Sequence, residues 1–250
     1  MIIAILQARM SSTRLPGKVM KPIIGKPMIQ LHVERLRRCK SIDKIIIATS
    51  TDDSDTVIHD FAKQENILVA RGPLHNVLER YAIAAQGFSP DHVLRVTADC
   101  PLADWRIIDK IVETHLELKT DYYSNTLPMS FPDGLDAEIM RYDVLQEAHQ
   151  RASTAYQKEH VTPYIKEHHD YKKACLQRKT DLSEVRWTVD TPEDFLFTSK
   201  VYETLYVDNP AFTSEDILGL IKQQPSLQEL NTENIHVKKI LGEGSIFQSF

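Results

Sequence analysis

The sequence predicts an α/β fold in which helices cover both faces of a Rossmann-like, mostly parallel sheet. Residues 2–6 and 44–49 are continuous apolar runs rich in β-branched residues, as in strands that are buried on both faces. Amphipathic segments separate such runs up to about residue 118, and this strand–helix alternation is typical of parallel sheets. A chain of 250 residues is long enough to form one such core.

The elements follow in order along the first half of the chain. Pro27 can open the first helix, because proline fits a first helical turn, and Asp52–Asp55 can cap the second. Asp104 precedes a further amphipathic helix. We expect strands at 2–6, 44–49, 67–69 and 92–96, a second helix that ends near residue 64, and a third helix at 76–86.

The second half of the chain is less regular. Residues 121–180 mix turns, aromatic side chains and histidines, and we interpret them as an insertion over the carboxyl edge of the sheet, where such folds place their sites. Residues 186–190 predict a further strand, and Pro192 the start of a helix. We expect one domain over residues 1–225 and a C-terminal tail, 226–250, to which the pattern assigns no structure.

The charge of the chain favours a small anionic ligand over nucleic acid. The net charge is -5 and the pI about 6.1, whereas nucleic-acid-binding domains are usually basic. Residues 1–40 are nevertheless basic, with Glu34 as their single acid. We interpret part of this charge as the exposed face of a helix, namely Arg35, Arg37, Arg38 and Lys40.

The cysteines and the hydropathy indicate a cytoplasmic protein without a membrane segment. Cys39, Cys100 and Cys175 are far apart and form no CxxC pair, so neither a disulfide framework nor a zinc site is indicated. The opening residues MIIAILQARM become charged too early for a signal peptide. No apolar run approaches the ~18 residues that a membrane helix needs.

The loop after the first strand is suited to binding a triphosphate. It reads QARMSSTRLPGK over residues 7–18 and combines the cations Arg9, Arg14 and Lys18 with three hydroxyl side chains. Arginine forks and a lysine point charge are common phosphate ligands. The loop is not a Walker A motif, since GxxxxGK[ST] is absent. The alternative is a solvated loop that happens to be basic.

The longer segment QARMSSTRLPGKVMKPIIGKPMI resembles the signature of the sugar-acid cytidylyltransferases, and within them the spore-coat polysaccharide biosynthesis branch. Ala8-Arg9-Met10 stands where uridylyl and guanylyl transferases carry a glycine-rich loop, which favours the cytidylyl type. The resemblance reaches to about residue 225. It implies the fold of the GT-A-like nucleotide-diphospho-sugar transferases, CTP and a sugar or sugar acid as substrates, Mg²⁺ as cofactor, and a homodimer.

Two aspartates are the expected metal ligands. Asp99 follows a strand and precedes a proline, so that its carboxylate can point into a cleft, and magnesium in phosphate sites is usually held by one or two carboxylates. The resemblance makes Asp99 and Asp190 the magnesium ligands. Asp104 fits a helix cap better, and Arg186 and Asp194 are candidates for orienting Asp190. The expected catalytic set is Arg9, Lys18, Asp99 and Asp190.

The segment after the third strand, ARGPLHNVLERY, contacts the base in similar enzymes. Gly72 would let the backbone approach the ring closely. Arg80 has an alternative role as a surface ion pair with Glu79 or Asp91. The full expected nucleotide-binding set is Gln7, Ala8, Arg9, Arg14, Lys18, Arg71, Gly72, Arg80 and Thr97.

Residues for the acceptor sugar are expected in FPDGLDAEIM and EHVTPYI. Asp136 and Glu138 alternate along the predicted strand and so share a face, on which they can bind hydroxyl or amino groups. The alternative is a hairpin with a polar face. His160 lies in the stretch that covers the sugar and packs a dimer in similar proteins.

The residues and the resemblance together predict an enzyme that transfers CMP from CTP to a sugar, with a 2-keto sugar acid as the expected acceptor. The enzyme would release pyrophosphate and act in surface polysaccharide or glycan biosynthesis. Two other classes stay open. One is a glycosyltransferase of the same architecture. Such enzymes carry a DxD metal motif, and the DDSD segment at residues 52–55 would supply it. The other is a catalytically silent nucleotide-binding protein.

Overall fold

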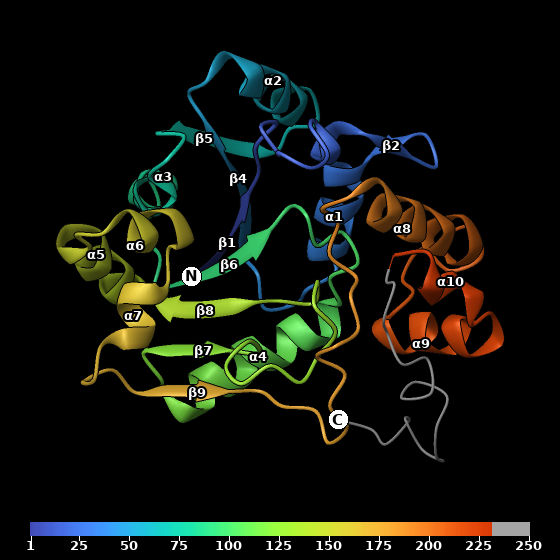
Figure 1. Ribbon diagram of the computed structural model, residues 1–250. Coiled ribbons are helices and arrows are strands. Elements are labelled where there is room, and N and C mark those ends of the chain that lie inside the picture. The colour runs from blue at the N-terminus through green and yellow to red at the C-terminus, as the bar shows by residue number, and fades with distance from the viewer. Residues whose placement is uncertain (232–250) are drawn as a thin grey trace.

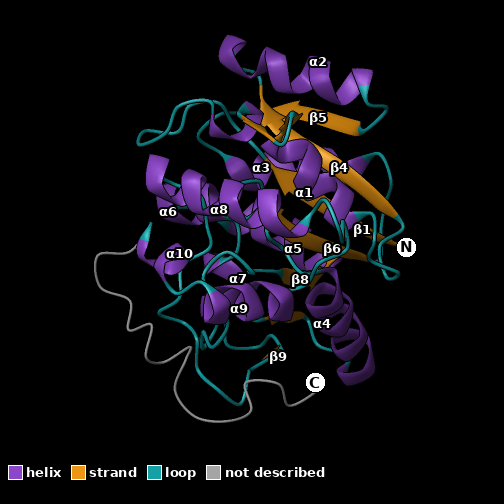
Figure 2. Ribbon diagram, turned by 90° about the vertical axis from the view of Figure 1, so that its right-hand side faces the viewer, coloured by secondary structure: helices purple, strands orange, loops and turns teal. Residues whose placement is uncertain are grey.

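The computed structural model describes residues 1–231 as one sheet surrounded by helices (Figures 1 and 2). The strands are β1 (Ile2–Gln7), β4 (Lys44–Ser50), β5 (Leu68–Gly72), β6 (His92–Thr97), β7 (Tyr122–Ser124), β8 (Glu138–Arg141) and β9 (Lys173–Cys175), with a small hairpin of β2 (Pro22–Ile23) and β3 (Lys26–Pro27) beside the sheet. The helices are α1 (Met28–Leu36), α2 (Thr56–Gln64), α3 (Val77–Gln86), α4 (Trp105–Leu118), α5 (Tyr142–Arg151), α6 (Ala155–His160), α7 (Pro163–Glu167), α8 (Pro192–Leu205), α9 (Ser214–Gln223) and α10 (Ser226–Glu229).

The sheet is mostly parallel, as predicted. Its seven strands lie in the order β5-β4-β1-β6-β8-β7-β9, and β8 alone runs against the others, since it is antiparallel to both β6 and β7. Successive strands are added on one side of β1 as far as β5, and β6 is then added on the other side of β1. Ligands of open α/β sheets bind beyond the carboxyl ends of the strands at such a switch point. The loops that follow β1 and β6 are therefore placed at the expected edge.

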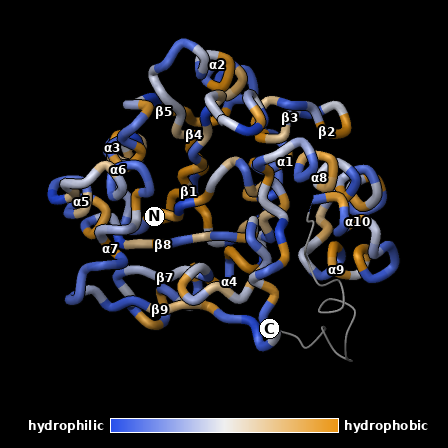
Figure 3. Tube along the Cα trace, in the orientation of Figure 1, coloured by the Kyte–Doolittle hydropathy of each residue, from blue (hydrophilic) through white to orange (hydrophobic). Residues whose placement is uncertain are grey.

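Alternate residues of β1 enter two separate cores. Ala4 and Leu6 pack with α1, α2, α4, α8 and α9, whereas Ile3 and Ile5 pack with α3, α5 and α7. Figure 1 shows these two groups of helices on opposite sides of the sheet, and Figure 3 shows the apolar strands between them. A strand buried on both faces needs a continuous apolar run. The prediction of helices on both faces is confirmed.

The segment 121–180 divides into two parts. It contributes β7, β8 and β9 to the sheet itself, and its helices α5 to α7 cover one face. The expected insertion over the sheet edge is therefore wrong for the strands, because their hydrogen bonds extend the existing ladder from β6.

The strand predicted at residues 186–190 is also wrong. Arg186 forms an isolated bridge with Asp133, and farther along the segment the Val189 amide donates to the Asp99 carbonyl at 2.7 Å. The segment thus bonds to two different loops instead of to one neighbouring strand. Those bonds place Asp190, the last residue of the segment, beside the loop that contains Asp99.

Arg35 does not belong to the exposed face of α1. It is 2% exposed, its guanidinium donates to the carbonyls of Ala103 at 2.5 Å and Phe212 at 2.9 Å, and it stacks on the Phe212 ring. The arginine thus joins α1 to two distant segments. Arg37, Arg38 and Lys40 are exposed, as predicted.

The first residues of the predicted tail pack against the domain. Leu227 on α10 is buried, and the Asn231 amide donates to the Arg186 carbonyl at 2.9 Å. The rest of the predicted tail, 232–250, lies outside the described residues. Among residues 1–231, no helix is both long enough and apolar enough to cross a lipid bilayer.

Candidate active site

A tight turn shapes the loop after β1. The Lys18 amide donates to the Leu15 carbonyl at 3.2 Å, and Gly17 has φ +69°, so that Leu15–Lys18 is a turn with proline second and glycine third. This is the sequence pattern of a type II turn, whose third residue needs positive φ. The Gly17 amide also donates to the Met10 carbonyl at 2.9 Å and closes the loop. The turn directs the Lys18 side chain inward, where it is 6% exposed.

Lys18 joins the two predicted metal ligands. Its ammonium donates to Asp190 Oδ1 at 2.9 Å and to the Val189 carbonyl at 2.6 Å, and it lies 3.3 Å from Asp99 Oδ2. Residues 18, 99 and 190 are far apart in sequence, and the fold brings them together so that the Lys18 ammonium lies between the carboxylates of Asp99 and Asp190. Burial would raise the pKa of Asp190, but the hydrogen bond from Lys18 holds it below its ordinary value.

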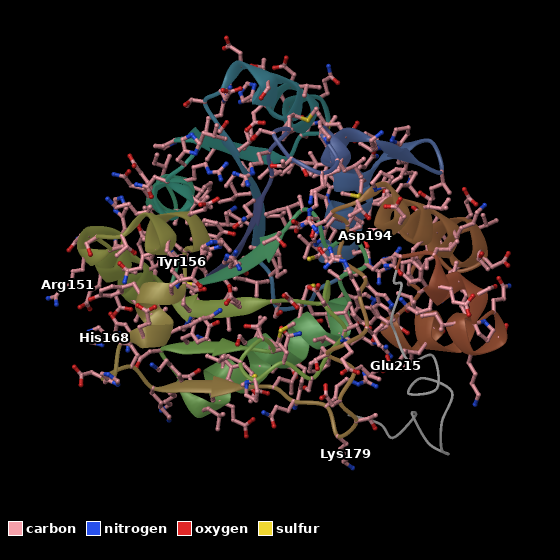
Figure 4. All side chains as sticks on the ribbon, in the orientation of Figure 1. Arg151, Tyr156, His168, Lys179, Asp194 and Glu215 are labelled. Carbon is pink, nitrogen blue, oxygen red and sulfur yellow. The ribbon has the colours of Figure 1, made fainter. Side chains whose placement is uncertain are left out.

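Further cations surround Asp190. Arg14 contacts its Oδ2 at 2.9 Å, and Arg186 donates to the same oxygen at 2.6 Å. Asp194, which lies in the interior in Figure 4, accepts the amide hydrogen of Asp190 at 2.9 Å and also caps α8 together with Thr191. Arg186 bonds to Asp194 as well, at 3.2 Å. The expectation that Arg186 and Asp194 orient Asp190 therefore agrees with these contacts.

Lys18, Asp99 and Asp190 line a pocket of about 300 Å³ beyond the carboxyl ends of β1 and β6. It brings together most of the predicted site residues, from the β1 loop, α3, β6, α6 and the segment before α8. The lining residues are Gln7, Ala8, Arg9, Ser12, Thr13, Arg14, Lys18, Val19, Val77, Arg80, Arg95, Thr97, Ala98, Asp99, Glu159, His160 and Asp190.

Arg80 reaches this pocket from α3. It is 2% exposed, and within residues 1–231 its Nε and Nη1 have no hydrogen-bond partner and no carboxylate forms an ion pair with it. The alternative of a surface ion pair with Glu79 or Asp91 is therefore wrong. Burial lowers the pKa of this guanidinium. An unpaired buried cation is costly, and a ligand that accepts its hydrogen bonds would remove that cost.

Arg71 and Gly72 do not line the pocket. The Arg71 guanidinium donates to the carbonyls of Ser50 and Asp52, both at 2.8 Å, and so holds the turn after β4. A Cβ on Gly72 would lie 2.9 Å from Arg80 Cγ. Gly72 thus makes room for Arg80 instead of for a base.

The DDSD segment is structural. Asp52 accepts from the Ser54 amide at 3.0 Å, as a cap does. Buried Asp55 accepts from the Met10 amide at 2.6 Å and from Ser50, which ties the β1 loop to the end of β4. None of these acids lines the pocket described above.

Glu138 lies behind the pocket wall, not in it. It is 1% exposed, begins β8, and contacts Arg95 and Lys166 at 2.5 Å each. Although burial alone would raise its pKa, these two cations hold it at about 2. Tyr122 and Thr162 also donate to its carboxylate, at 2.5 and 3.1 Å. Glu138 is therefore a structural anion that positions Arg95.

Asp136 precedes β8, so it does not share a strand with Glu138, contrary to the prediction. It is also not among the residues that line the pocket. Burial, followed by the charges of Asp133 and Glu138, raises its pKa to about 7. Asp133 is bound by Arg186 at 3.0 Å. Near neutral pH, Asp136 is the acid of this group that exchanges a proton.

The sequence prediction missed Arg95 and Glu159. Arg95 interrupts the apolar strand HVLRVT. A charged residue is rarely buried without a partner, so a charge in a buried strand indicates a functional or paired residue. Glu159 carried no comparable signal, because it stands in an exposed, polar helix.

The carboxylates fit a magnesium ion bound to phosphates. Within residues 1–231, no three His, Cys, Asp or Glu side chains converge as a metal site. Asp99 and Asp190, however, both lie within 3.3 Å of one ammonium nitrogen, so their oxygens already converge on a cation. Magnesium in phosphate-transfer sites commonly takes one or two carboxylates and completes its shell with water and substrate oxygens.

The sequence is similar to those of known proteins over most of its length. An uncharacterised protein of Methanocaldococcus jannaschii is 33% identical over 237 residues, which cover 92% of this chain and 94% of that protein. The spore coat polysaccharide biosynthesis protein SpsF of Bacillus subtilis is 29% identical over 233 residues, which cover 90% of this chain and 95% of SpsF.

Among solved structures, a cytidylyltransferase from Leptospira borgpetersenii matches with a TM-score of 0.88 and 29% identity over 94% of this chain and 99% of its own. A CMP:2-keto-3-deoxy-manno-octonic acid synthetase complexed with CTP shares the fold, with a TM-score of 0.58 and 17% identity over 81% of this chain and 98% of that one. The cytidylyltransferase family profile matches residues 3–204. The chain therefore belongs to the cytidylyltransferase family, and the expected class of enzyme, a nucleotidyltransferase, is confirmed.

Proposed function

We propose that this enzyme transfers CMP from CTP to a hydroxyl group of a sugar, specifically a 2-keto sugar acid, in the cytoplasmic synthesis of a surface polysaccharide or other glycan. The observation that carries the proposal is Lys18 between Asp99 and Asp190 at the end of a cationic loop. The matched protein SpsF is named for polysaccharide biosynthesis, and a further relative is a 3-deoxy-manno-octulosonate cytidylyltransferase of Trichlorobacter lovleyi, 33% identical over 115 residues, 46% of this chain and 45% of that protein.

The reaction is an in-line displacement. The acceptor hydroxyl releases its proton to water and its oxygen forms a bond to the α-phosphorus of CTP. The bond from that phosphorus to the bridging oxygen breaks, and pyrophosphate leaves with the electron pair. Negative charge grows on the leaving group, so catalysis consists mainly of positioning and electrostatic stabilisation. Arg9, Arg14 and Lys18 are proposed to hold the phosphates, since all three line one pocket.

Asp99 and Asp190 are proposed to hold Mg²⁺. When bound, the ion would neutralise phosphate charge and orient the α-phosphate. Lys18 then keeps the two carboxylates together, and Arg186 fixes one oxygen of Asp190 from behind at 2.6 Å.

The nucleoside side of the pocket is formed by the β1 loop and α3. Gln7 and Ala8 lie at the end of β1, and Arg80 lines the pocket from α3 without an ion-pair partner among the described residues. Cytosine has acceptors at O2 and N3, whereas uracil carries a hydrogen on N3. A donor aimed at N3 therefore favours CTP over UTP, because uracil would leave it unpaired.

The glycosyltransferase alternative is disfavoured by the DDSD segment, whose acids cap a turn and anchor the β1 loop. A silent nucleotide-binding protein would have no need for two carboxylates around Lys18. The distinguishing experiment is a pyrophosphate-release screen of four nucleoside triphosphates against a panel of 2-keto sugar acids with Mg²⁺. CTP-dependent release is expected. Nucleotide binding without release from any acceptor would refute the proposal.

We also propose a homodimer. Sedimentation equilibrium of the full chain measures the mass directly, and a value of one chain, 28.7 kDa, at micromolar concentration would refute it.

A further inference from the structure

The pocket has a cationic floor that lies apart from the phosphate loop. Arg95 pairs with Ile5 in the register of β6 and β1, two residues before the last pair, Gln7 and Thr97. At ~3.3 Å per residue, it lies roughly 7 Å below the carboxyl end of the sheet. Its side chain is 17% exposed and lines the pocket. The floor is therefore reached from the pocket but lies deeper than the loop cations.

A buried carboxylate fixes this arginine from behind. Arg95 Nη1 donates to Glu138 at 2.5 Å, while its Nε has no acceptor among the described residues. Glu138 also pairs with Lys166, so two cations share one carboxylate and the group keeps a net positive charge. Charge-assisted hydrogen bonds of a held guanidinium are strong and directional. Arg95 is thus a guanidinium held in place by Glu138, and the part of its side chain that stays exposed lines the pocket.

The same carboxylate also holds the part of the pocket rim that carries His160. Thr162 Oγ1 donates to Glu138 at 3.1 Å, and the Thr162 amide donates to the His160 carbonyl at 2.8 Å. Between them, fully buried Val161 has φ +70° and ψ −56°, the conformation of a strained γ-turn. Strained turns persist where the surroundings fix them, often at functional sites. Glu138 therefore positions both Arg95 and the turn that carries His160.

The other cations of the pocket already have roles. Lys18 and Arg14 are paired with Asp190 at the loop end, and Arg80 lies on the α3 side. Arg95 lies on β6, between β1 and β8 in the sheet, and lines the pocket together with the α6 residues Glu159 and His160. Glu159 is exposed. This part of the pocket therefore has a cation of its own that is not paired with Asp190.

We infer that Arg95, positioned by Glu138, binds an anionic group of the acceptor, a carboxylate or a phosphate, with His160 at the rim. The inference rests on the proposed function, because it takes the second substrate to be a sugar. It assigns acceptor recognition to a residue on β6 instead of to Glu138 or Asp136.

The test compares two variants that each remove one cation from Glu138. Arg95→Met removes the cation that lines the pocket, and Lys166→Met removes the one that does not. Arg95→Lys keeps the charge but loses the fork, and reports on the site if Arg95→Met fails to fold. Calorimetry in the presence of a non-hydrolysable CTP analogue measures binding of 3-deoxy-manno-octulosonate, its neutral methyl ester and a sugar phosphate, without requiring turnover.

Wild-type protein is expected to bind an anionic sugar at least ~10-fold more tightly than the ester, the lower range for a charge-assisted hydrogen bond. Arg95→Met should abolish this preference and leave CTP-analogue affinity within about twofold, while Lys166→Met retains it. A preference for the acid or for the phosphate each supports the inference and identifies the group. Equal binding of acid and ester, or equal losses in both variants, would overturn it. Anion preference without pyrophosphate release would instead refute the proposed function alone.

Discussion

Replacement of Lys18 by methionine tests the centre of the site. Methionine keeps an unbranched apolar stem and removes the ammonium that lies within 3.3 Å of Asp99 and 2.9 Å of Asp190. Asp190 keeps its contacts to Arg14 and Arg186. Asp99 has no other ion pair among the described residues. The two carboxylates would then face each other without the cation they share.

The contacts set the size of the effect. Loss of one transition-state contact typically costs ~100-fold in turnover, or about 2.7 kcal/mol. The Val189 carbonyl also loses its donor, and an unpaired buried acceptor costs ~1–3 kcal/mol of unfolding free energy. The pKa of Asp190 should rise in this variant, because Lys18 is the strongest influence that holds it down. Turnover should thus fall ~100-fold, while the free energy of unfolding should fall by no more than ~3 kcal/mol.

The assays are CTP affinity by calorimetry, pyrophosphate release with Mg²⁺, and thermal unfolding. Lys40→Met is the matched control, since the Lys40 side chain is exposed and does not line the pocket, and such lysines contribute little. Lys18→Arg keeps the charge and should retain part of the affinity. If Lys18→Met binds CTP and turns over like wild type, the loop is a solvated basic loop and the assignment of the site fails.

Three further outcomes are expected. Asp99→Asn and Asp190→Asn should each lower turnover at least ~100-fold with an unchanged circular dichroism spectrum, and near wild-type rates in either would remove that residue from the proposed metal site. CTP should exceed UTP at least ~100-fold in kcat/KM, and Arg80→Met should shrink this ratio; a ratio that survives a weaker CTP affinity would assign Arg80 to the phosphates instead. The pKa of Asp136 is raised to about 7 from an ordinary value of 3.8, so the folded state binds this proton more tightly, and the associated stability is lost as pH rises through 7. Denaturant titrations between pH 4 and 8 should show this fall in wild type and a flatter profile in Asp136→Asn; identical profiles would contradict the shift.

Local patterns determined the framework of the protein. A parallel strand that is buried on both faces must be apolar along its length. For this reason β1 and β4 could be predicted from the sequence alone. The phosphate-binding character of the β1 loop could also be predicted, since its cations, hydroxyl groups and Pro-Gly turn are contiguous in the chain. Together with the parallel topology, these features predict that Lys18 and Asp99 lie at one edge of the sheet.

What the tertiary structure alone decided were the partners of individual charges. Arg35, Arg80 and Arg95 are all arginines in regular elements, yet one joins distant segments, one is unpaired in the pocket, and one is held by Glu138. Helical or strand periodicity tells which face a residue occupies, but not what a distant segment places against that face. The cost of burying a charge depends on that partner, because a carboxylate, a carbonyl or a ligand each compensates it differently. For this reason the sequence could indicate Glu138 as a functional acid, while only the fold showed that it is buried and paired with Arg95.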